Sequence, residues 1–236
     1  MKLLDKLHML HRFWHYRLRT ERESIQFLLG QKISGTIAID VGANRGVYTY
    51  WLSRQVGKAG KVFAFEPQPE LTLPLEELKK SFCLNNVSII NKGLSSTHNF
   101  LQLHREKVGS GGASFHFEKK RIMSITVETI RLDDYFVENP TPSLPVSFIK
   151  IDVEGHELEV FKGAEDTVLK HTPTLLFECH HAAANKGELF SFLVERGYTG
   201  WFFHDKRKID YAEFDQFPYR KPGESHRNYI FIHKNQ

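Results

Sequence analysis

The sequence predicts an α/β fold built on a doubly wound parallel sheet, and three observations lead to this prediction. Apolar runs typical of buried strands alternate with amphipathic helical patterns through most of the 236 residues. Residues 36–49 read as a strand that runs into a glycine-bearing turn and a helix start. Two strand patterns, 198–204 and 228–233, come last with a polar loop between them, which predicts a late antiparallel pair. The hydrophobic content of 41% suits one sizeable core.

The first strand, predicted at 37–41, is apolar apart from Asp40, as expected of a central strand covered on both faces. Gly42 and Gly46 bracket the turn that follows, and Asn44 also tolerates a left-handed conformation. This spacing is not the Gly-x-Gly-x-x-Gly of a dinucleotide site. Asp40 would repel a pyrophosphate but attract an ammonium or sulfonium group, both of which S-adenosylmethionine carries. The alternative is an ordinary strand–turn–helix connection with Asp40 as the helix N-cap.

A second buried strand is predicted at 61–65, directly before Glu66 and Pro67. In a βαβ unit, an acid at this place reaches the ribose hydroxyls of the ligand. Two such charge-assisted hydrogen bonds contribute on the order of 1.5–3 kcal/mol. The alternative is a solvated glutamate at a strand end, which the preceding apolar run makes the weaker interpretation. A helix over 70–82 and a short strand over 87–93 follow.

The pattern changes between residues 95 and 130. Residues 100–104 and 122–130 alternate like antiparallel strands around a glycine-rich stretch at 108–114. We predict an antiparallel hairpin insertion or a mobile cover over the site. The glycine-rich stretch is not a P-loop, because it neither follows a buried strand nor precedes Lys-Ser or Lys-Thr.

Further strands are predicted at 146–153 and 174–179, with helices over 158–169 and 189–196. In an open α/β sheet, ligands bind at the carboxyl ends of the strands. Isolated acids at strand ends are often only helix N-caps. Four together on one rim favour a cationic ligand or proton chemistry. The four acids that close apolar strands are Asp40, Glu66, Asp152 and Glu178.

The densest cluster of charged residues is 150–157, which includes Asp152, Glu154 and His156. These side chains could supply a general base or a metal pair, or could be acids that favour a helix start. A His-Glu-x-x-His zinc site is excluded, because Val160 stands where its second histidine would be. The adjacent histidines 180–181 could add a base, although we interpret them as solvent-facing.

The first 22 residues carry six basic and two acidic side chains, which equals the whole formal net charge of +4. Their apolar residues follow helical spacing, so we predict an amphipathic helical segment over 1–34 before a domain over 35–236. Such a helix can make peripheral contact with an anionic membrane through residues 1–22, or bind a partner, but we favour packing of its apolar stripe on the domain. The stripe comprises Leu3, Leu7, Leu10, Trp14 and Leu18.

The two cysteines lie far apart and suggest neither a disulfide framework nor a zinc site, which fits a reducing cytosol. No apolar run reaches the roughly 18 residues of a membrane span, and no signal-peptide core is present. We therefore expect a cytoplasmic protein. Its first 22 residues could also attach it to a membrane surface.

Five motifs in this order resemble the FkbM family of S-adenosylmethionine-dependent methyltransferases: residues 39–49, Phe65-Glu66-Pro67, 129–134, 148–157 and Leu176-Phe177-Glu178. The resemblance covers about residues 35–234. It implies a class I methyltransferase with a seven-stranded Rossmann-like sheet and O-methylation of a hydroxyl group on a sugar, glycolipid or natural product. The turn 42–46 would hold the methionine part of the cofactor, Glu66 the ribose, and 91–94 the adenine. The implied cofactor-binding residues are Asp40, Gly42, Ala43, Asn44, Gly46, Tyr48, Thr49, Glu66, Pro67, Gly93, Leu94 and Asp152.

Methyl transfer to a hydroxyl needs in-line alignment, which can supply roughly 7–11 kcal/mol, and a general base, which adds about 10²–10⁴-fold. We expect Asp152 or Glu154 to act as the base or to orient it, with help from His156, and Glu178 is the next candidate. A divalent metal held by Asp152 and Glu154 could instead acidify the hydroxyl.

Two other functions remain open. A nucleic-acid methyltransferase that acts on amines carries Asn/Asp-Pro-Pro-aromatic where this chain has 152–155, so we expect no nucleic-acid substrate. A non-catalytic binding module would be expected to lack some of the site acids, which are all present. The acceptor depends on 95–130 and on the loop 205–227, whose aromatic residues could stack on a sugar: Tyr211, Phe214, Phe217 and Tyr219.

Overall fold

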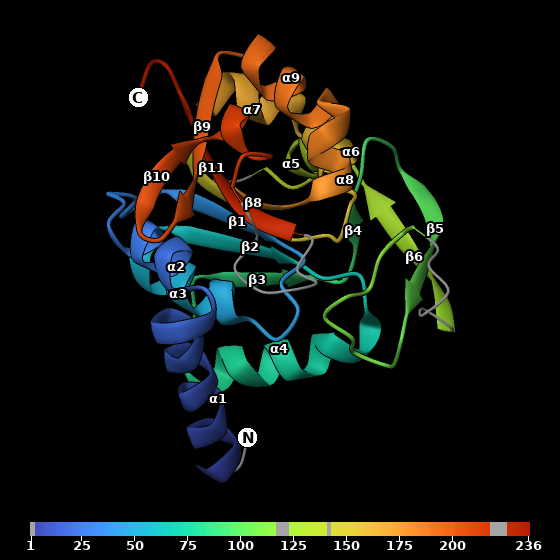
Figure 1. The fold of residues 1–236 in the computed structure, drawn as a ribbon. Helices are drawn as coiled ribbons and strands as arrows, with labels where there is room; N and C mark the ends of the chain where they lie inside the picture. The colour runs from blue at the N-terminus through green and yellow to red at the C-terminus, as the bar shows by residue number, and fades with distance from the viewer. Residues whose placement is uncertain (1–2, 117–122, 141–142, 218–225) are drawn as a thin grey trace.

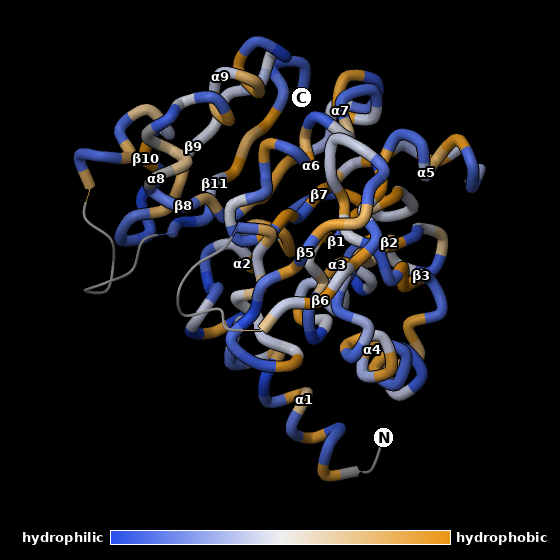
Figure 2. The backbone as a smooth tube through the Cα atoms, turned by 90° about the vertical axis from the view of Figure 1, so that its right-hand side faces the viewer, coloured by the Kyte–Doolittle hydropathy of each residue, from blue (hydrophilic) through white to orange (hydrophobic). Residues whose placement is uncertain are grey.

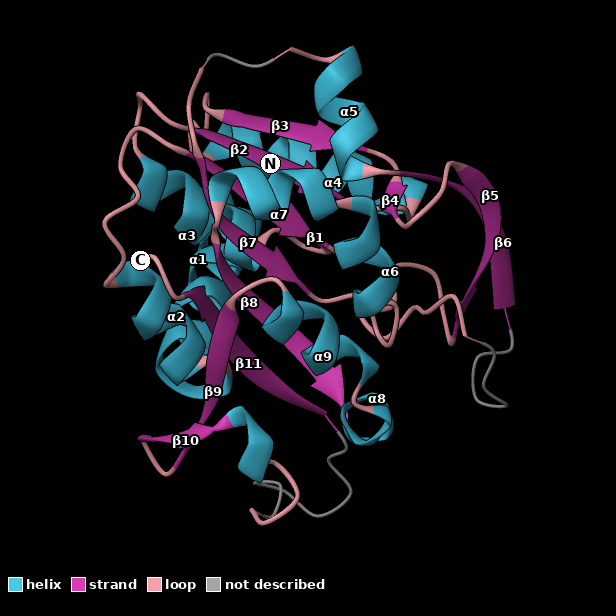
Figure 3. Cartoon of the chain, turned by 90° about the horizontal axis from the view of Figure 1, so that it is seen from above, coloured by secondary structure: helices cyan, strands magenta, loops and turns pink. Residues whose placement is uncertain are grey.

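The computed structural model describes residues 3–116, 123–140, 143–217 and 226–236. Its centre is an eight-stranded sheet in the order β10-β9-β11-β8-β7-β1-β2-β3 (Figure 1; Figure 3 from above). The strands β1, β2, β3, β7 and β8 are parallel, whereas β11 runs antiparallel to both β8 and β9. The doubly wound α/β prediction is therefore confirmed. The bounds are β1 Ile37–Val41, β2 Lys61–Phe65, β3 Val87–Ile90, β7 Val146–Ile151, β8 Thr174–His180, β9 Tyr198–His204, β10 Arg207–Asp210 and β11 His226–His233.

The expected count of seven strands was wrong by one. The additional strand, β10, lies in the polar stretch 205–227, where the sequence predicts a loop, and it pairs antiparallel with β9. Asp205 and Lys206 both have positive φ, 48° and 65°, and they join the two strands. A two-residue connection of this handedness matches the twist of a β-hairpin. The short, polar sequence of β10 hides this strand from a search for apolar alternation.

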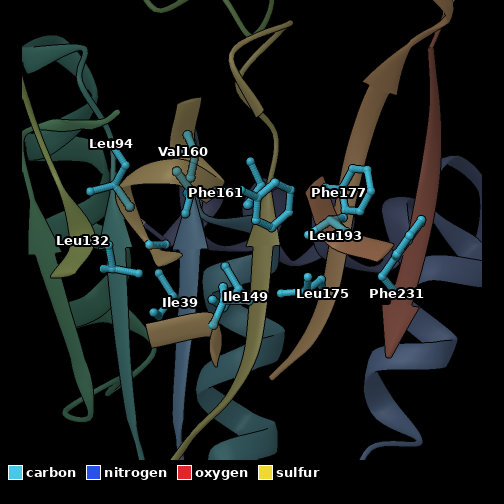
Figure 4. Packing of buried hydrophobic residues seen from close by; sticks show 14 of the residues in the cluster. Ile39, Leu94, Leu132, Ile149, Val160, Phe161, Leu175, Phe177, Leu193 and Phe231 are labelled. Carbon is cyan, nitrogen blue, oxygen red and sulfur yellow. The ribbon is translucent and has the colours of Figure 1, made fainter. Parts of the chain in front are cut away.

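Helices cover both faces of the sheet (Figure 1). Alternate strand residues point to opposite faces, so two hydrophobic clusters form. Ile39, Ile149 and Phe177 pack under α5, α6, α7 and α9 (Figure 4). Ala38 and Phe148 belong to the cluster under the N-terminal helices, α3 and α4. The helix predicted at 158–169 is two helices that meet at Ala164. The remaining bounds are α3 Val47–Val56, α4 Pro69–Ser81, α5 Leu132–Glu138, α6 Glu157–Gly163, α7 Glu165–His171, α8 His181–Lys186 and α9 Glu188–Glu195.

The N-terminal segment comprises α1 (Leu3–His15), a π-helix η1 (Tyr16–Thr20) and α2 (Arg22–Leu29). Its packing on the domain was predicted, and two residues of the predicted stripe, Leu10 and Trp14, contact the domain, with Phe13 beside them. Phe13 is fully buried and its ring stacks on Tyr50 at 4.3 Å. Leu7 and Leu18 of the predicted stripe are 53% and 52% exposed. Figure 2 shows hydrophobic and hydrophilic residues interspersed along α1, which projects from the domain.

The predicted hairpin insertion is present as β5 (Asn99–Arg105) and β6 (Met123–Ile130). With the two-residue strand β4 (Gly93–Leu94) it forms a second sheet in the order β4-β6-β5. Residue 122, the predicted start of the second strand, lies outside the described residues, as does Tyr219. Within the described ranges, no helix combines the length and the apolar composition that a bilayer crossing requires.

Candidate functional site

A row of polar side chains crosses four strands at the carboxyl edge of the sheet. Asp40 on β1 lies beside Lys150 on β7, and Glu178 on β8 lies beside Asn228 on β11. Asp40, Lys150 and Glu178 each follow a member of the second cluster by two residues, so they share the sheet face that α3 covers. Lys150 is 2% exposed, and its Nζ lies 3.6 Å from Asp152 Oδ2. A lysine is therefore buried among the strand-end acids.

Burial controls the charge of this row. It raises the pKa of Glu178 to about 9, and the charge of Asp152 adds to the effect. It raises the pKa of Asp40 to about 6. Burial alone would lower the pKa of Lys150, but the surrounding carboxylates, Asp152 first, raise it more strongly. Lys150 thus keeps its charge, and the acids carry less negative charge at neutral pH than their number suggests.

The β1–α3 turn has the conformation that its glycines predict. Gly42, Asn44 and Gly46 have φ of 76°, 48° and 76°. A Cβ on Gly42 would lie 2.0 Å from the carbonyl oxygen of Asp152, so only glycine fits there. Asp40 accepts a hydrogen bond from the Thr49 hydroxyl at 2.5 Å. It is not the N-cap of α3, since Gly46 occupies that position.

A first pocket lies against this turn. Its wall includes Glu66, whose two oxygens accept the backbone N–H groups of Asn44 (2.8 Å) and Gln68 (2.9 Å). Each oxygen retains a lone pair for a further donor. Burial raises the pKa of Glu66 to about 7. A carboxylate beside apolar walls suits the ribose and base of a nucleoside cofactor. The predicted cofactor residues that line this pocket are Gly42, Asn44, Glu66, Pro67, Gly93, Leu94 and Asp152, joined by Phe65, Leu103, Phe115 and Val153.

The loop after β5 covers the first pocket. Gln68 Nε2 donates to the Ser110 carbonyl at 3.0 Å, and the Ser114 hydroxyl donates to the Glu154 carbonyl at 2.6 Å. Ala113 and Phe115 line the pocket, which leaves a cavity of about 40 Å³. Pockets for small molecules measure roughly 300–1,000 Å³. With this loop over it, the cavity is therefore smaller than the usual pocket for a small molecule.

A second pocket of about 430 Å³ adjoins the first and shares Gly42, Asn44, Gly111 and Asp152 with it. Asp40, Lys150 and Glu178 of the polar row line it, and one wall comes from the N-terminal segment. The predicted residues that line only this second pocket are Asp40, Ala43, Tyr48 and Glu178. Gly46 and Thr49 line neither pocket: Gly46 lies against α4, and Thr49 holds Asp40.

Two of the four predicted catalytic residues reach the pockets. Asp152 lines both and Glu178 lines the second, whereas Glu154 and His156 line neither. Glu154 Oε2 lies 3.1 Å from His180 Nε2, so this histidine has a carboxylate neighbour. His156 is 8% exposed with its Nε2 3.0 Å from the Ser95 hydroxyl, and burial lowers its pKa to about 4. Within the described chain, no three His, Cys, Asp or Glu side chains group as a metal site.

Three residues of the site are not among those predicted from the sequence. Lys150 had a visible signal, because it is the one charged residue in the apolar run 146–151. His226 lies with its Nε2 3.0 Å from Glu178 Oε1. Its position follows from β11 being antiparallel, since the first residue of such a strand shares the edge where its parallel neighbours end. Glu21 lines the second pocket from the N-terminal segment, and no local pattern reveals it.

The parallel sheet, with its candidate site at the carboxyl ends of the strands, defines a Rossmann-like α/β fold. The model of the Methyltransferase FkbM domain matches residues 40–199. The chain therefore belongs to the FkbM methyltransferase family.

Two curated relatives are similar over most of the chain. Hexuronic acid methyltransferase AglP of Haloferax volcanii is 30% identical over 168 residues, 71% of this chain and 66% of AglP. Methyltransferase sdnD of Sordaria araneosa is 25% identical over 196 residues, 70% of this chain and 74% of its own length. The match thus leaves a third of AglP without a counterpart.

Two solved structures share the fold. Methyltransferase FkbM of Methylobacillus flagellatus superposes with a TM-score of 0.55 at 15% identity, over 86% of this chain and 45% of that one. SMU.1697c of Streptococcus mutans, in complex with SAH, has a TM-score of 0.54 at 14% identity, over 91% and 98%.

Proposed function

We propose that the protein is an S-adenosylmethionine-dependent O-methyltransferase that acts on a hydroxyl group of a sugar, glycolipid or natural product. The observation that carries the proposal is the pair of adjoining pockets with Asp152 in the wall of both. One pocket offers Glu66 to a ribose, and the other is large enough for a sugar-sized acceptor. The name of AglP, a hexuronic acid methyltransferase, supports a sugar acceptor.

The residues of the chain divide the work of the reaction. When bound, S-adenosylmethionine supplies the methyl group as an electrophile. Glu66 binds the ribose. The acids of the polar row, Asp40 among them, attract the cationic methionine end. The acceptor hydroxyl oxygen would form a bond to the methyl carbon as the bond from that carbon to sulfur breaks, which leaves S-adenosylhomocysteine, and the hydroxyl proton would pass to a base. Asp152 is the candidate base because it faces both pockets, and Lys150 balances its charge.

Glu178 is the second candidate for the base that takes the proton of the acceptor hydroxyl. His226 contacts it and is 43% exposed, so the pair can carry a proton from the pocket to solvent. Burial raises the pKa of Glu178 to about 9, so the residue holds a proton at neutral pH and becomes a base where the cofactor's positive charge favours its ionised form.

Calorimetric titration with S-adenosylhomocysteine tests the cofactor assignment. We expect micromolar binding, and a Glu66→Ala variant should bind about ten- to a hundredfold more weakly, since it loses charge-assisted hydrogen bonds. Glu76→Ala on the outer side of α4 is the control and should bind as the wild type does. Absence of binding to the wild-type protein would contradict the proposal.

We also propose that α1 contacts an anionic membrane surface. Leu4 and Leu7 are 78% and 53% exposed beside the basic residues of a projecting helix. The protein should co-sediment with phosphatidylglycerol vesicles at low salt and release at high salt. A Leu4→Ser/Leu7→Ser variant should bind less. Val137→Ser, which removes a 79% exposed apolar residue on α5, should not change binding. Equal binding to neutral phosphatidylcholine would contradict the proposal.

A further inference from the structure

One wall of the second pocket comes from a segment outside the family-matched residues 40–199. Arg12 on α1 and Tyr16 and Thr20 on η1 follow one another at intervals of four, so they lie along one side of the helical segment. π-helical turns such as η1 are rare and often occur at functional sites. The wall is therefore built from an arginine and two hydroxyl-bearing side chains.

Glu21, directly after η1, fixes this wall to the domain. Its Oε2 accepts hydrogen bonds from the Tyr48 hydroxyl at 3.1 Å and from Asn228 Nδ2 at 2.6 Å. These partners belong to α3 and β11, which lie far apart in the sequence. The N-terminal segment is thus held at the polar row itself.

Three cationic side chains line the second pocket together with the acids of the polar row. They come from three separate parts of the chain: Arg12 from α1, Arg45 from the β1–α3 turn and Lys107 from the cover loop. Arg45 lies under the cover, since its Nη2 is 4.0 Å from where a Cβ of Gly109 would be. In the described part of the chain, no carboxylate pairs with any of the three. The buried Lys150, by contrast, has Asp152 beside it.

Unpaired cations that converge on a concave pocket attract anions, and an arginine fork matches a carboxylate or phosphate in geometry. We propose that Arg12, Arg45 and Lys107 bind an anionic group of the methyl acceptor, so that the N-terminal segment selects an acidic sugar. This inference rests on the proposed methyltransferase function. The acceptor hydroxyl would lie toward Asp152, and its carboxylate or phosphate toward the rim.

The carboxylate of the cofactor's methionine part is the competing source of negative charge. Calorimetry distinguishes binding of this carboxylate from binding of the acceptor's anionic group. S-adenosylhomocysteine carries that carboxylate, and 5′-methylthioadenosine lacks it. An Arg12→Met variant should bind both within about twofold of the wild type. A tenfold loss confined to S-adenosylhomocysteine would assign Arg12 to the cofactor and overturn the proposal.

Ligand-observed NMR then tests the acceptor side, with saturating S-adenosylhomocysteine present. Glucuronate and glucose 6-phosphate should receive more saturation transfer from the wild-type protein than glucose does. Arg12→Met should lose this preference, Arg12→Lys should retain part of it, and Arg19→Met, an exposed residue of η1, should keep it in full. Equal signals for glucose, or none for either acid at millimolar concentration, would overturn the inference. Failure of S-adenosylhomocysteine to bind the wild type would instead refute the proposed function.

Discussion

Several ionisable side chains of this protein are buried where they hold backbone turns together. Glu157 is 2% exposed, and its Oε1 accepts the N–H of Gly155 at 2.9 Å. Glu66 fixes the β1–α3 turn and the end of β2 in the same way. Burial raises the pKa of each carboxyl to about 7. These two groups make the stability of the protein dependent on pH near neutrality.

Glu157→Gln tests this dependence. Between the unfolded pKa of 4.5 and the folded pKa of about 7, the folded protein still holds a proton that the unfolded chain has released. Stability therefore falls as the pH rises through this window, by up to about 1.4 kcal/mol per pH unit for one group, and then levels off. Glutamine does not titrate, so the variant should gain stability relative to the wild type between pH 5 and pH 8.

Denaturant unfolding at both pH values measures the effect. Glu138→Gln at the exposed end of α5 should run parallel to the wild type and serves as the control. Parallel profiles for Glu157→Gln would contradict the prediction.

For single residues, the sequence predicted the acids at the strand ends but not the side chains that contact them. Asp40, Glu66, Asp152 and Glu178 each follow an apolar run, which is a local pattern. Glu21 and His226 reach the site through contacts across many residues, so no window of sequence contains their signal. His156 carries the motif of the family, yet packing against Ser95 and Phe115 withdraws it from both pockets.

Among the elements, the β1–α3 turn depends most on one residue. Gly42→Ala would place a Cβ 2.0 Å from the Asp152 carbonyl oxygen in addition to requiring a left-handed conformation. Gly35→Ala requires a similar φ of 77° but meets no atom within 4 Å. Left-handed strain alone costs about 1–2 kcal/mol, so Gly35→Ala should lower stability by that amount and keep S-adenosylhomocysteine affinity.

Gly42→Ala should lose more stability than Gly35→Ala and at least tenfold in affinity, because the turn must move away from Asp152. Thermal unfolding and calorimetry of the two variants provide the comparison. Equal behaviour would mean that backbone strain, and not close approach, explains the glycine.

The strength of each element's periodic signal decided whether it was predicted. The strands β1, β2, β7 and β8 are covered on both faces, so their apolar runs are clear. The strand β10 is exposed and polar, and it exists because of the left-handed pair before it. For α1 the spacing predicted a helix with one apolar stripe, and this stripe does not include Phe13. The ring of Phe13 fits between Tyr50 and Phe82, and this contact helps to determine which side of α1 faces the domain.

For the whole molecule, the N-terminal segment shares a hydrophobic cluster with the sheet. Phe13→Ala should lower the free energy of unfolding by about 3–5 kcal/mol, the usual effect of deleting a buried phenylalanine. Leu7→Ala on the exposed side of the same helix should change it by less than about 0.5 kcal/mol. Chemical denaturation of both variants checks this. Similar values would show that α1 folds apart from the domain, as the predicted division at residue 34 allows.

The position of β11 has a consequence for how the molecule is made. It follows the other described strands in sequence, yet it lies between β8 and β9. Until residues 226–233 have left the ribosome, both of those strands present unpaired edges, which are templates for association with other chains. Glu178 also lacks Asn228 and His226 as neighbours until then. A growing chain therefore exposes two strand edges until the strand that completes its site has been made.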